Sequence, residues 1–206
     1  MSFPDFYQQA PTITVHDALA QLLGACSDGI LTYHYLDAVR LTGHSCPTVA
    51  GAYLMTRRAL ELLYPGQTPE RGAIHVQFSS AMDHGVTGVI ASVVGLITGA
   101  AGQCGFKGIG RQFQRQNLME FARDISGEAC FTRTDNAASV TLAMQMGVVQ
   151  PHPRTSLLLK KILTGLSSTD DNSEFTALWQ ERVKCILLAH ADDPELIEVI
   201  ATTSAN

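Results

Sequence analysis

The sequence predicts an α+β fold in which a mixed or antiparallel sheet packs against helices and a helical C-terminal extension follows. Alternating apolar residues over 74–78 predict a half-buried strand, and residues 128–134 and 138–145 predict two more, joined by a turn. Apolar residues spaced three and four apart predict a helix over 47–63. Because the helices and strands do not alternate strictly, a purely parallel α/β sheet is not expected.

The remaining elements follow from caps and patterning. We expect a first helix over residues 14–25 with Thr14 as its cap, followed by a strand or hairpin over 30–42. Asp83 is expected to cap a further helix over 84–98. The residues expected to be buried in the first helix are Leu19, Leu22 and Leu23.

Length and composition predict a single sizeable core. The chain has 206 residues, of which 46% are apolar. Pro151 and Pro153 mark a boundary, after which the pattern is helical throughout. We therefore expect an α+β metal-binding core over residues 1–150. The extension over 151–206 is expected to pack on this core or on a dimer partner.

Charge and cysteine usage exclude several classes of protein. The net charge is −5 and the basic residues form no cluster, so a nucleic-acid partner is not expected. Residues 85–106 carry no charge but include six glycines, which favours a buried core helix over a membrane span. The start of the chain has no signal-peptide pattern, and its five cysteines are widely spaced. These features predict a cytoplasmic protein with reduced thiols.

The most informative segment is Gly43-His44-Ser45-Cys46-Pro47, directly before the helix over 47–63. Proline is favoured at the first helical position, so Cys46 is expected at the N-cap. A thiol at a helix N-terminus lies at the positive end of the helix dipole, which favours the thiolate. Side chains two apart in an extended segment point the same way, so His44 and Cys46 are able to converge.

Three interpretations of this pair remain open. Mixed sulfur and nitrogen ligation suits a divalent transition metal, and zinc best, with an open position for water or a small-molecule substrate. Alternatively, Cys46 is the nucleophile of a metal-free thiol enzyme, with a histidine as base and Asp83 as the group that orients it. In the third, Cys46 is a packed thiol beside a helix cap, and the chain is a non-catalytic, dimeric interaction module.

Other residues qualify as members of the same site. Asp83 and His84 stand together at the expected start of a helix, where His84 is a candidate metal ligand. Cys104 lies among glycines and is a second candidate ligand. Lys107 and Arg111 follow in the same glycine-rich segment and offer positive charge to an anionic cofactor or substrate.

Residues 43–63 and 74–111 resemble the E-type component of formylmethanofuran dehydrogenase and its family. The family's motif, His-Gly-His-x-Cys-Pro-Gly, stands here as residues 42–48, Thr-Gly-His-Ser-Cys-Pro-Thr. Its Cys-x-x-Asp segment stands as residues 80–83, Ser-Ala-Met-Asp, and its glycine-rich turn and Gly-Lys pair as 99–105 and 110–111. The resemblance implies an α+β core, a metal-binding active site, a homodimer and a one-carbon or redox-related role.

The chain departs from the family at three positions of these motifs. Thr42 replaces the first histidine, Thr48 replaces the glycine after the proline, and Ser80 replaces a second cysteine. His84 and Cys104 are the candidates for compensating ligands. The expected metal site therefore consists of His44, Cys46, His84 and Cys104.

Overall fold

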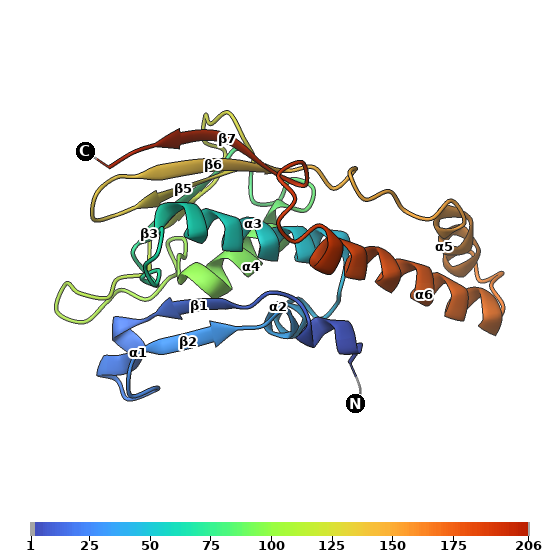
Figure 1. Cartoon of the computed structure of the whole chain (residues 1–206), viewed down its shortest axis with the longest axis horizontal. Coiled ribbons are helices and arrows are strands. Elements are labelled where there is room, and N and C mark those ends of the chain that lie inside the picture. The colour runs from blue at the N-terminus through green and yellow to red at the C-terminus, as the bar shows by residue number, and fades with distance from the viewer. Residues whose placement is uncertain (1–2, 206) are drawn as a thin grey trace.

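The computed structural model describes residues 3–205, which fold into two sheets and the helices around them (Figure 1). Strands β1 (Ile13–His16) and β2 (Ile30–Tyr33) form an antiparallel hairpin in which Ile13 pairs with Tyr33. The second sheet has five strands in the order β4-β3-β5-β6-β7. Its strands are β3 (Ile74–Phe78), β4 (Met119–Glu120), β5 (Ala129–Arg133), β6 (Ser139–Met144) and β7 (Ile197–Thr203). Only the β3–β4 pairing is parallel, so the α+β class with a mixed sheet is confirmed.

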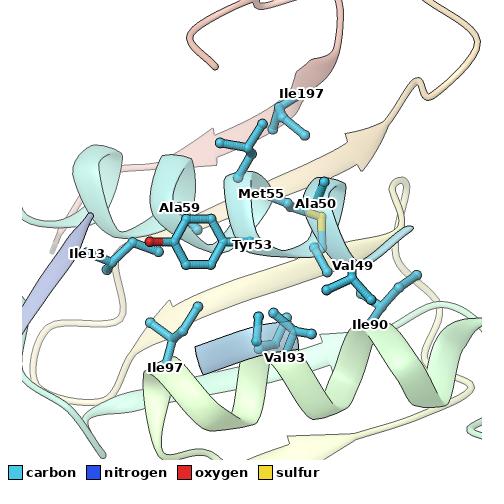
Figure 2. Packing of buried hydrophobic residues seen from close by; sticks show 14 of the residues in the cluster. Ile13, Val49, Ala50, Tyr53, Met55, Ala59, Ile90, Val93, Ile97 and Ile197 are labelled. Atoms are coloured by element: carbon cyan, nitrogen blue, oxygen red, sulfur yellow. The ribbon is translucent and has the colours of Figure 1, made fainter. Parts of the chain in front are cut away.

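The core lies between the five-stranded sheet and two long helices. These are α3 (Pro47–Leu63), which packs on β6, and α4 (Thr87–Thr98), which packs on α3. Figure 2 shows Ile90, Val93 and Ile97 of α4 pointing toward α3, where Tyr53 is fully buried. Shorter helices surround this core: η1 (Asp5–Gln8), α1 (Ala18–Leu22) and α2 (Tyr35–Thr42).

The C-terminal segment leaves the core and returns to it. Helices α5 (Thr155–Leu163) and α6 (Thr169–Lys184) form a helical hairpin whose outer part projects beyond the sheet (Figure 1). A short π-helical turn, η2 (Cys185–Ala189), continues α6 and packs on α3. Strand β7 then pairs with β6 at the edge of the sheet. The prediction of a purely helical extension missed this strand.

Helix α3 begins and ends where its sequence predicts. Cys46 is the N-cap in an extended conformation, and Pro47 occupies the first turn, where no N–H is needed. The strand over 74–78 and the pair of strands on either side of the turn at 134–136 are likewise confirmed.

Three expectations about local structure are wrong. The segment predicted as a helix over 14–25 contains strand β1 and the five-residue helix α1, capped by Asp17 instead of Thr14. Leu22 and Leu23 are largely exposed, because the alternation of buried Ile13 and Val15 places the strand against the core. The other two errors concern ranges. Residues 35–42 are helical instead of extended, and α4 starts at Thr87 with Val86 as its N-cap, so Asp83 caps no helix.

A buried ion pair network joins the hairpin to the rest of the core. Asp17 accepts hydrogen bonds from Arg71 and Arg115, each at 2.8 Å, and its side chain is only 4% exposed. Gly72 lies directly against Arg115, where a Cβ atom would overlap the guanidinium. Arg115 belongs to the loop after α4, so one carboxylate fixes this loop and the hairpin together.

Within residues 3–205, no helix is both long enough and apolar enough to cross a membrane. The uncharged segment over 85–106 contains α4, whose apolar face lies in the core as expected.

Candidate functional site

The Gly-His-Ser-Cys-Pro segment forms the sharp connection between α2 and α3. Helix α2 ends at Thr42, and Gly43 follows with φ of 75°. This left-handed conformation terminates the helix and favours glycine, which has no Cβ to clash with the backbone. The chain then becomes extended at Cys46 and enters α3. The segment is therefore held at both ends by helix termini.

The His44 ring is exposed and its orientation is fixed by the backbone. Its Nδ1 lies 3.0 Å from the carbonyl oxygen of Thr42. Because a carbonyl oxygen only accepts hydrogen bonds, Nδ1 carries the proton in this arrangement and Nε2 keeps its lone pair. The Thr42 hydroxyl donates to the carbonyls of Ala38 and His44, which strengthens the turn. A histidine fixed in this way presents Nε2 as a ligand or base.

The Cys46 thiol lies at the N-terminus of α3. Its Sγ accepts a hydrogen bond from the backbone N–H of Val49 at 3.4 Å. The side chain is half-buried and packs against the hydrophobic core. The N–H bond and the positive end of a 17-residue helix both stabilise a negative sulfur. Cys46 is therefore both an N-cap and a candidate thiolate.

Ser45, between these two residues, is held by aromatic side chains. Its hydroxyl and that of Tyr35 are 2.9 Å apart, and its carbonyl accepts from Trp179 Nε1 at 2.9 Å. Burial raises the pKa of Tyr35, which keeps its hydroxyl neutral. Trp179 belongs to α6, so the C-terminal helix fixes the backbone between His44 and Cys46.

Two shallow cavities meet along α4 beside this segment. The first, of about 240 Å³, is lined by His44 and by Gly88 and Ser92 of α4. The second, of about 420 Å³, also reaches Gly88 and Ser92, and Cys104 is one of its lining residues. His44 and Cys104 therefore line neighbouring cavities with a common wall.

The other predicted residues lie around the same helix but outside these cavities. Asp83 and His84 are exposed in the loop that leads into α4. Lys107 and Arg111 are exposed in the glycine-rich loop after α4, and neither lines a cavity with Cys104. Cys46 does not line the cavity that His44 lines. The structure thus brings the predicted residues to one region without bringing them into mutual contact.

The predicted donor set does not form a metal centre by itself. Among residues 3–205, no three histidine, cysteine, aspartate or glutamate side chains lie together in a way that could hold a metal ion. A zinc site built from one chain needs three or four protein ligands. His44, Cys46, His84 and Cys104 therefore do not form a complete site within one chain. Any metal held by His44 and Cys46 takes its remaining ligands from elsewhere.

Sequence reasoning missed the residues that support the motif. Trp179 is the single tryptophan of the chain, and this rarity was the only signal that could have drawn attention to it. Gly88, Ser92 and Gly95 recur at spacings of four and three, which places them on one face of α4. This spacing was visible in the sequence but not connected to the motif.

Comparison with known protein families finds no matching family, and comparison with curated proteins finds no match either. The resemblance to the formylmethanofuran dehydrogenase E-type family therefore stays a prediction.

Proposed function

We propose that this chain is a cytoplasmic metal-binding protein in which His44 and Cys46 supply two ligands to a divalent transition metal, with zinc the best match. The observation that carries the proposal is the fixed tautomer of His44, whose Nδ1 is bound to the Thr42 carbonyl at 3.0 Å. This arrangement directs the free lone pair to Nε2, as in metal-binding histidines whose other nitrogen is hydrogen-bonded.

The chemistry of Cys46 supports the same proposal. A sulfur that accepts an N–H at a helix N-terminus is stabilised as the thiolate, the form that binds metals. One imidazole and one thiolate make a donor set that suits zinc, and the ion would supply Lewis acidity to a bound water or substrate. The open positions are the sites where a small-molecule substrate would bind. The residues of this chain anchor the ion and orient its histidine ligand.

The direct test is elemental analysis of untagged protein purified without chelator. We expect near-stoichiometric metal in the wild type and its loss in His44→Ala and Cys46→Ser. His84→Ala and Cys104→Ser are the matched controls, since these residues are exposed and belong to no group of three ligands in the described chain. Metal-free wild type, or full metal content in the double variant of His44 and Cys46, would overturn the proposal.

A second candidate function is a metal-free thiol enzyme with Cys46 as the nucleophile. The same hydrogen bond from Val49 to Sγ favours it, because a thiolate at a helix N-terminus is also a nucleophile. The expected partners, Asp83 and His84, lie in the loop before α4, and none of the described hydrogen bonds links them to Cys46. Iodoacetamide labelling of metal-free, folded protein tests this candidate. Stoichiometric labelling at Cys46 would favour it, and no labelling at Cys46 would exclude it.

A further inference from the structure

We infer that a second copy of this chain covers the surface beside His44, and that the α5–α6 hairpin of one copy packs into a groove on α4 of the other. Two unpartnered surfaces of complementary shape and charge support this pairing. Its consequence for the metal rests on the proposed function above, whereas the pairing itself does not.

The first surface is an exposed row of leucines on the hairpin. Leu159 and Leu163 lie four apart on one face of α5, and Leu166 follows just after the helix. The exposed fractions of Leu163 and Leu166 are 76% and 78%. Helix α5 packs on α6 and projects away from the sheet (Figure 1), so its own core does not cover these side chains. We call α5, α6 and these residues the leucine arm.

The second surface is a groove along α4. Gly88, Ser92 and Gly95 share the face opposite to Ile90, Val93 and Ile97, which point into the core in Figure 2. The small residues leave a hollow, the 420 Å³ cavity, whose walls include Met82, Met119 and Phe121. Met82 is 59% exposed at its rim. We call this hollow the α4 groove.

The two surfaces match in shape and in charge. Large leucine side chains on one helix pack into the hollow that small residues leave on another. Lys160 lies on the arm between Leu159 and Leu163, and Asp83 lies next to Met82 at the groove. Neither Lys160 nor Asp83 forms an ion pair within the described chain, so the two charges are available to each other.

A second copy is the occupant that carries both surfaces at once. In a symmetric pair, residue i of one protomer meets residue j of the other and the reverse, so one contact satisfies both arms and both grooves. The groove shares Gly88 and Ser92 with the cavity that His44 lines. An arm seated there would therefore close the side of the motif on which a metal held by His44 lacks ligands, and would exclude water from it.

The test measures mass and contact in the full-length protein. Light scattering after size exclusion is expected to give twice the mass of one chain for the wild type. Leu163→Glu with Leu166→Glu is expected to give the monomer, and so is Ser92→Arg in the groove. Leu22→Glu with Leu23→Glu is the matched control, because these leucines are comparably exposed on α1, and it is expected to remain dimeric.

Cross-linking identifies the contact itself. Leu163→Cys is expected to form a disulfide-linked dimer through Cys104, which is the exposed native cysteine of the groove, and Leu22→Cys is not. A monomeric wild type would overturn the inference, as would a dimer that the arm variants leave intact. Dissociation by the α1 control as readily as by the arm variants would also overturn it. Metal analysis of the same samples keeps these outcomes separate from failure of the proposed metal site.

Discussion

The indole Nε1 of Trp179 donates a 2.9 Å hydrogen bond to the carbonyl oxygen of Ser45, although 134 residues separate them in the chain. This bond links the C-terminal helix α6 to the segment that carries His44 and Cys46. It fixes the backbone between the two candidate ligands at its midpoint. The position of the site therefore depends on a helix that the motif itself does not specify.

Trp179→Phe is expected to weaken this link while keeping an aromatic ring against Phe175. Loss of one neutral hydrogen bond costs about 1 kcal/mol, which in a chain of this size lowers Tm by about 2–4 °C. We also expect weaker metal binding, because the Ser45 carbonyl is released. Thermal unfolding and a metal titration measure the two effects. Phe175→Leu serves as the control, since it alters the ring pair and leaves the hydrogen bond, and equal metal affinity in wild type and Trp179→Phe would contradict the expected role of this bond.

Gly43→Ala is expected to affect both stability and metal binding. Its φ of 75° costs a residue with a Cβ about 1–2 kcal/mol, and His44 follows directly. Gly165→Ala is the matched control, because Gly165 has φ of 69° after α5, and at both positions a Cβ would meet no atom within 4 Å. Both variants should lose similar stability, measured by denaturant unfolding. A metal affinity reduced equally in both would show that the geometry of the motif is not specifically required.

Asp17→Asn is expected to destabilise the fold by about 3 kcal/mol, since it removes the charge that compensates two arginines, one of them buried. Burial by itself favours the neutral acid, but the hydrogen bond from Arg71 and the charge of Arg115 hold the pKa of Asp17 below its ordinary value of 3.8. The contribution of this carboxylate is therefore complete above pH 3.8 and is lost as the pH falls through the lowered pKa. Asp124→Asn, at an exposed position, is the control for denaturant unfolding. A stability loss as small as that of the control would contradict the role of the network.

The pair of His16 and Glu70 predicts a pH dependence of the opposite sign. The 2.6 Å hydrogen bond to Glu70 raises the pKa of His16 above its ordinary value of 6.5. Its charged contribution is therefore fully present below pH 6.5 and is lost as the pH rises through the raised pKa. Both side chains are partly exposed, so we expect less than about 1 kcal/mol. The difference in unfolding free energy between wild type and Glu70→Gln should shrink from about pH 5.5 to about pH 8, and a difference that grows over this range would contradict the assignment.

The sequence predicts those elements that local chemistry determines. Pro47 and the apolar stripe define α3, and strict alternation defines β3. Local pattern failed where distant pairing decides the structure. Strand β7 exists because it pairs with β6, more than fifty residues earlier, and Ile13 and Val15 form a strand because β2 pairs with them.

The candidate site shows the same division. The N-cap role of Cys46 follows from the proline after it, and the structure confirms it. The grouping of four metal ligands required contacts between separate loops, which spacing along the chain does not specify. His84 and Cys104 belong to loops before and after α4, and the described residues include no group of three ligands. The Trp179 contact likewise depends on how α6 packs, which sequence alone did not reveal.

X-ray absorption spectroscopy of the zinc-loaded protein tests the central claim most directly. We expect one sulfur at about 2.3 Å and one imidazole nitrogen at about 2.0 Å in the coordination shell. The sulfur should disappear in Cys46→Ser and the imidazole signal in His44→Ala, while Cys104→Ser keeps both. A shell of oxygen and nitrogen ligands alone, or a sulfur that persists in Cys46→Ser, would contradict the claim that this pair binds the metal.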